Sequence, residues 1–89
     1  MSISAELDDR VADVRVTDDA LEVHLRDGRK ISAPLDWFPR LAAATAEQRA
    51  KWEPSAAGHG IHWPEIDEDL SVEGLLRGVD APGASRRAV

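Results

Sequence analysis

Two histidines and a run of carboxylates stand close together in the second half of this 89-residue chain. His59 and His62 precede an acidic segment at 65–69, and imidazole and carboxylate groups together can hold zinc with one position open for water. The spacing does not favour a metal site, because residues three apart on an extended stretch point to opposite faces. Neither histidine lies in an H-E-x-x-H pattern. We therefore expect no metal and no cofactor, with His62 packed beside Trp63 and His59 exposed in a loop.

Paired carboxylates are the second group that could do chemistry. Asp67 with Asp69, or Glu53 with Glu65, could act as general acid and base, but such pairs need a deep cleft and a raised pKa. A chain this short can hardly build a cleft and a core together. We expect no catalytic residue and no enzyme, and the acidic turn instead caps the last helix. The enzyme alternative is a metal-assisted hydrolase that uses the two histidines with Asp67 and Asp69.

The middle of the chain is basic and could contact nucleic acid. Trp37 and Trp52 could stack on bases there. However, the basic side chains are spread over a predicted hairpin and two helices: Arg26, Arg29, Lys30, Arg40, Arg49 and Lys51. The net charge of the chain is −6, which disfavours binding to a phosphate backbone. Direct nucleic-acid binding is not expected, and a DNA-associated transcriptional regulator remains an alternative.

The acidic charge is concentrated in one segment. Residues 53–73 carry six acids and no lysine or arginine. Such a segment favours a basic protein as partner, because complementary charge steers association. The plain alternative is that acidity keeps a small domain soluble.

The first half of the chain has the pattern of an antiparallel meander. Apolar residues alternate with polar ones from Leu21 to Leu25, which predicts a half-buried strand. Asp27-Gly28 follows, a strong hairpin signal, and extended structure resumes from Lys30 to Leu35. With the β-branched stretch that starts at Val11, three strands are predicted between residues 11 and 35.

Short helices are predicted in the second half. Asp36 is expected to cap a helix that starts at Trp37. Thr45 and Gln48 have the spacing of a capping box for a second helix that runs to about Trp52. Residues 60–63 form a short strand. Ser71 caps a last helix, which Gly78 ends in a left-handed conformation.

These elements predict an α+β domain. Its small antiparallel meander sheet has three strands plus a short fourth, with two or three short helices packed on one face. Residues 1–10 are expected to form a flexible arm, 11–78 the single domain and 79–89 a disordered tail. The longest apolar run, 41–44, is far short of the about 20 residues of a membrane span, and no signal peptide opens the chain, so a cytoplasmic location is expected. The sheet has open edges, so a homodimer is physically reasonable.

Four segments resemble a bacterial family of small proteins known as domain of unknown function 2442. They are ISAPLDWFPRL at 31–41, ATAEQR at 44–49, WE at 52–53 and GHGIHWPEIDEDLSVEGLL at 58–76. The part at 60–76 is the most specific, and the resemblance covers about residues 11–78. It implies an α+β domain with a small antiparallel sheet. It also implies a role beside a second small gene product, in an arrangement similar to a toxin–antitoxin pair, while some members carry a repressor-like DNA-binding domain after this one. The eleven residues after Gly78 cannot form such a domain, and the resemblance implies no catalytic residue.

The function predicted from the sequence is a non-enzymatic, antitoxin-like protein-binding module. It would dock a small basic protein, such as the product of the adjacent gene, through its acidic loop. The predicted partner-binding residues are Trp63, Glu65, Asp67, Glu68 and Asp69. Large aromatic residues within a charged rim are typical of interfaces.

Overall fold

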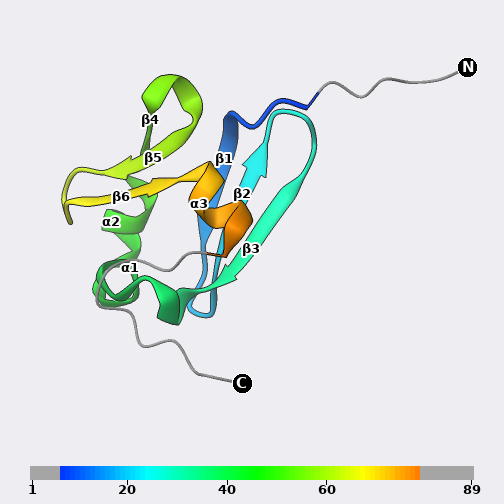
Figure 1. Ribbon diagram of the computed structural model, residues 1–89. Coiled ribbons are helices and arrows are strands. Elements are labelled where there is room, and N and C mark those ends of the chain that lie inside the picture. The colour runs from blue at the N-terminus through cyan, green and yellow to red at the C-terminus, as the bar shows by residue number, and fades with distance from the viewer. Residues whose placement is uncertain (1–6, 79–89) are drawn as a thin grey trace, which may run out of the picture.

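The computed structural model describes residues 7–78 as two small antiparallel sheets with short helices (Figure 1). The first sheet contains β1 (Val11–Val16), β2 (Ala20–Leu25) and β3 (Lys30–Pro34), in the order β1-β2-β3. This is the predicted meander. The residues expected to form most of the N-terminal arm and the C-terminal tail, 1–6 and 79–89, lie outside the described part.

The turn between β2 and β3 confirms the Asp-Gly signal. Val23 pairs with Ile31 and Leu21 with Ala33, which sets the apolar side chains of the two strands side by side. Gly28 has a φ of 98°, a left-handed conformation that glycine adopts without steric cost. The N-terminal residues reach this turn, because Asp8 donates its backbone N–H to the Asp27 carboxylate at 3.0 Å.

The second sheet contains two strands that the sequence does not reveal. β5 (Gly60–Trp63) was predicted, and it is flanked by β4 (Glu53–Ser55) and β6 (Glu68–Ser71). β4 is short and contains a proline, while β6 begins inside the acidic run, so neither has the alternation of a strand. The α+β class with antiparallel sheets is confirmed, and the fourth strand belongs to a separate sheet.

Helix α1 (Pro39–Ala43) starts later than predicted. Asp36 lies within a single 3₁₀ turn, Leu35–Trp37, and does not cap a helix; the residue before α1 is Phe38. The ring of a proline disfavours helical geometry in the preceding residue, and Phe38 has φ −128° and ψ 80°. The helix therefore begins at Pro39, where a missing N–H costs nothing.

The other helix ends follow the sequence. In α2 (Ala46–Ala50) the predicted capping box is present, with Thr45 Oγ1 accepting from Gln48 N at 3.1 Å and Gln48 Oε1 accepting from Thr45 N at 3.0 Å. In α3 (Val72–Arg77) the Ser71 hydroxyl accepts from Gly74 N at 2.9 Å. Gly78 ends α3 in a left-handed conformation, as predicted.

One buried cluster joins both sheets and the helices. Its fully buried large side chains come from both sheets and two helical regions: Leu21 and Val23 from β2, Phe38 and Leu41 around α1, Ile61 and Trp63 from β5, and Val72 from α3. The second sheet is thus an integral layer of the core. Within residues 7–78, no helix is long and apolar enough to cross a membrane.

Candidate functional site

The acidic segment 65–69 spans the turn between β5 and β6 and the first two residues of β6. Its backbone closes with a hydrogen bond from Ile66 N to the Trp63 carbonyl at 3.3 Å. Asp67 adopts a left-handed conformation with φ 53°, which aspartate visits more readily than most residues. Glu65, Asp67 and Asp69 are exposed on this turn, whereas Glu68 is buried. The segment therefore holds four carboxylates, of which three are exposed and one is buried.

Strand register explains why Glu68 turns inward. Trp63 pairs with Glu68, and His62 pairs with Asp69. Directly paired residues of an antiparallel sheet share one face, so Glu68 lies on the face of Trp63, the core face. Glu68 is 5% exposed and Trp63 is fully buried. The sequence gives little sign of this, since Glu68 is one acid within a run of acids.

The buried carboxyl group of Glu68 is poorly supplied with hydrogen bonds. Oε1 accepts from Asp69 N at 3.2 Å, while Oε2 has no hydrogen-bond partner among residues 7–78. Burial raises the pKa of Glu68. The hydrogen bond from Asp69 N and the charge of Arg40 oppose this shift in the pKa, and the negative charges of Asp67 and Asp69 add to it.

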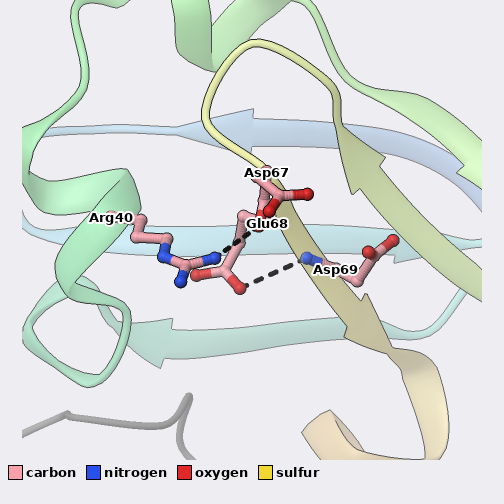
Figure 2. Close-up of a pocket in the computed structure, with 4 residues that line it drawn as sticks. All are labelled: Arg40, Asp67, Glu68 and Asp69. Atoms are coloured by element: carbon pink, nitrogen blue, oxygen red, sulfur yellow. Dashed lines mark hydrogen bonds between the residues drawn. The ribbon is translucent and has the colours of Figure 1, made fainter.

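Arg40 of α1 forms the other wall of this site. Its Nη1 donates to the Asp67 carbonyl at 2.5 Å, across 27 positions in the sequence. Arg40, Asp67, Glu68 and Asp69 line a cavity of about 270 Å³. Figure 2 shows the Glu68 carboxyl group on the side of the turn that faces Arg40, while the Asp69 side chain points the other way.

On the outer face of the second sheet, His62 lies between two acids. It pairs with Glu53 of β4 on one side and with Asp69 of β6 on the other. Its Nδ1 lies 2.8 Å from Asp69 Oδ1. Glu65 at the turn pairs with Lys51 Nζ at 2.8 Å. Two of the exposed acids of the turn thus already have basic neighbours, and no partner is recorded for the Asp67 carboxylate within residues 7–78.

Trp63 occupies a different place from the one expected of a docking residue. Its indole is fully buried, and Nε1 donates to the Arg49 carbonyl at 3.0 Å, which joins β5 to the end of α2. Trp63 therefore supports the acidic turn from beneath and presents no side-chain surface to a partner. Trp37 and Trp52 are partly buried against the same core.

The histidine–carboxylate set of the hydrolase alternative is only partly brought together. His62 meets Asp69, but no group of three or more His, Asp or Glu side chains in the described part is arranged to hold a metal ion. His59 is exposed, and its backbone carbonyl accepts from Val72 N at 3.0 Å. Its recorded contacts are structural ones at the start of α3.

Several basic residues of the middle segment make intramolecular contacts. Arg29 binds Asp9 and Asp27, and Lys51 binds Glu65. Arg49 donates to the carbonyl groups of Leu41 and Ala42 at the end of α1, at 2.9 and 3.0 Å, and pairs with Asp18 in the β1–β2 turn at 3.4 Å. These three side chains therefore hold parts of the fold together.

The sequence between residues 11 and 81 matches the model of a protein family whose description is "Protein of unknown function (DUF2442)". No curated protein matches the chain.

Two solved structures are similar to this fold. A protein of unknown function from Rhodospirillum rubrum shares 30% sequence identity, with a TM-score of 0.70 over 84% of this chain and 93% of that one. The uncharacterized protein CV0863 from Chromobacterium violaceum, solved by NMR, shares 25% identity, with a TM-score of 0.70 over 83% of this chain and 70% of that one. Neither description names an activity.

Proposed function

Because the chain belongs to the DUF2442 family, whose description assigns no activity, we propose its function from its own surface: it is a non-enzymatic module that binds a small basic protein through the turn 65–69. The proposed setting is the cytoplasm. The proposed partner is the product of the adjacent gene, in an antitoxin-like pair.

The observation that carries this proposal is the fixed presentation of acidic side chains on a turn that is held from several sides. Trp63 supports the turn from the core, and Arg40 holds its backbone through the Asp67 carbonyl. A rigid surface loses less conformational entropy on binding than a mobile loop. Exposed carboxylates at such a surface attract a basic partner and orient it.

The test is binding to the product of the adjacent gene, measured by calorimetry and stopped-flow kinetics at several salt concentrations. The double variant Glu65→Gln with Asp67→Asn removes two exposed charges, and asparagine tolerates the left-handed conformation at position 67. We expect its association rate to fall about tenfold at low salt, with a smaller loss at high salt, because salt screens exposed charges.

The matched control is Asp18→Asn with Asp19→Asn, which removes the same charge from the exposed β1–β2 turn. This control should leave association nearly unchanged. The proposal fails if no complex forms, if the rate does not depend on salt, or if both double variants lower it equally.

A further inference from the structure

We infer that the cavity between Arg40 and Glu68 receives the ammonium group of a lysine side chain from the partner. This inference rests on the proposed function and deepens it, because it assigns a defined pocket to one residue type of that partner.

The first argument is an unsatisfied oxygen on a residue that lines the cavity. Glu68 is 95% buried, which follows from its 5% exposure, and its Oε2 accepts no hydrogen bond from residues 7–78. A buried acceptor without a donor is costly, and native structures rarely retain one without a reason. A ligand that donates to the Oε2 of the carboxylate recovers this cost on binding.

The second argument is the charge of the lining. Three of the four lining residues are acids, and Arg40 is the single base. The neighbouring charges of Asp67 and Asp69 are close enough to Glu68 to raise its pKa. A cationic donor is therefore favoured over a neutral one at this site, and an anion is disfavoured.

The third argument distinguishes an ammonium from a guanidinium group. Glu68 Oε1 is already engaged by Asp69 N, and the Asp69 carboxylate is engaged by His62 on the outer face. One free oxygen cannot give the two parallel acceptors that suit the planar fork of arginine. An ammonium group is a compact charge with three donors, and a cavity of about 270 Å³ has room for it and its last methylene groups.

Arg40 lines the cavity from helix α1, whereas the other three lining residues lie next to one another at 67–69. Its side chain is exposed and makes a hydrogen bond to the Asp67 carbonyl, and it makes no ion pair with Glu68 within 4.0 Å. Oε2 is covered from solvent, so the lining of the cavity has to adjust for a ligand to reach it, and Arg40 is the one cation in that lining. A shorter, uncharged residue at position 40 should therefore ease binding.

The test uses n-butylammonium as a probe for the lysine side chain, with ¹⁵N-labelled protein followed by NMR at constant ionic strength. The reporter is the Asp69 amide, which donates to Glu68 Oε1. We expect saturable shifts of this amide with n-butylammonium, at least about tenfold weaker binding of n-butylguanidinium, and no saturation with tetramethylammonium, which has charge but no N–H donor.

Variants complete the test. Glu68→Gln should abolish saturation, Glu47→Gln on the exposed face of α2 should leave it unchanged, and Arg40→Gln should strengthen it. Equal response to all three cations, a response that survives Glu68→Gln, or weaker binding in Arg40→Gln would overturn the inference. If n-butylammonium does not saturate while the partner still binds through Glu65 and Asp67, the lysine pocket is wrong and the proposed function stands.

Discussion

Two carboxyl groups in this small domain are covered from solvent, and their pKa values shift in opposite directions. Asp27 in the β2–β3 turn has a side chain that is 4% exposed, and Glu68 in the second sheet is 5% exposed. Hydrogen bonds from Arg29, with a further one from the Asp8 backbone, lower the pKa of Asp27 to about 2. Burial raises the pKa of Glu68, whose carboxyl group accepts a hydrogen bond from Asp69 N.

The difference shows that the supply of donors, and not burial itself, decides in which direction the pKa of a covered carboxyl group moves. Asp27 accepts from Asp8 N, Arg29 N and Arg29 Nε at 3.0, 3.0 and 2.8 Å. These donors come from the turn itself and from the chain just before β1. At Glu68 the nearest base, Arg40, donates to a backbone carbonyl instead. The carboxylate of Asp27 thus has its hydrogen bonds supplied within the fold, whereas Glu68 keeps one oxygen without a donor from residues 7–78.

The largest expected effect comes from removing the wall against which Glu68 is buried. Trp63→Ala should lower the free energy of unfolding by about 3–5 kcal/mol, because it opens a cavity in the core and removes the hydrogen bond to the Arg49 carbonyl. In the folded fraction, the pKa of Glu68 should fall toward its ordinary value as water reaches it. Urea denaturation measures the stability, and Trp63→Phe is the milder control. A loss below about 1 kcal/mol would mean that the second sheet is not part of the common core.

The next effect concerns Asp27, whose substitution by asparagine should lower Tm by several degrees at neutral pH. The amide cannot accept from Arg29 and Asp8 as a carboxylate does. Because the folded-state pKa of Asp27 lies below the unfolded one, its contribution is present above the unfolded value and is lost as pH falls toward about 2. Thermal unfolding at neutral and strongly acidic pH checks this, with the exposed Asp19→Asn as control. Equal losses at both pH values would contradict it.

Glu68 should behave in the opposite sense. Glu68→Gln should raise the free energy of unfolding by about 1 kcal/mol at neutral pH, because it removes a charge that burial disfavours. The pKa of Glu68 is raised on folding, so the protonated form is stabilising below the unfolded value and that stability is lost as pH rises through the folded value. The gain from Gln should therefore disappear near pH 4. Chemical denaturation across this range measures it, and Glu65→Gln is the exposed control. A destabilised variant at neutral pH would show that Glu68 is held charged by contacts that compensate its burial.

The smallest effect is expected at the outer face. Asp69→Asn removes the carboxylate that lies 2.8 Å from His62 Nδ1. The side chains of His62 and Asp69 are 27% and 68% exposed. Exposed pairs contribute about 0–1 kcal/mol, so the change in stability should stay within that range and shrink with added salt. Denaturation at low and high salt tests this. A larger loss of the free energy of unfolding that salt does not reduce would show that this pair stabilises the fold as strongly as buried contacts do.

Local chemistry accounts for what could be predicted from sequence. The Asp27-Gly28 hairpin, the Thr45–Gln48 capping box and the left-handed Gly78 each depend on residues that are close in the chain, so their patterns are visible there. The start of α1 was misplaced because the restriction that Pro39 places on Phe38 outweighs the capping tendency of Asp36.

The site itself depended on contacts that sequence does not record. Glu68 is buried because it pairs with Trp63 across the second sheet, and two of the three strands in that sheet have no alternation to reveal them. Arg40 reaches the Asp67 carbonyl from 27 positions away. The placement of Trp63 could not be read from its neighbours, because aromatic residues suit both a core and an interface.

The contacts of Arg49 link local unfolding in different parts of the domain. Its side chain holds the last carbonyls of α1, its own carbonyl receives the Trp63 indole, and its guanidinium reaches Asp18. Local unfolding at this one position would release three segments that are remote in sequence. Neither α2 nor β5 can separate from the domain alone. The amide hydrogens of the two segments should therefore exchange with solvent at the same free energy of opening.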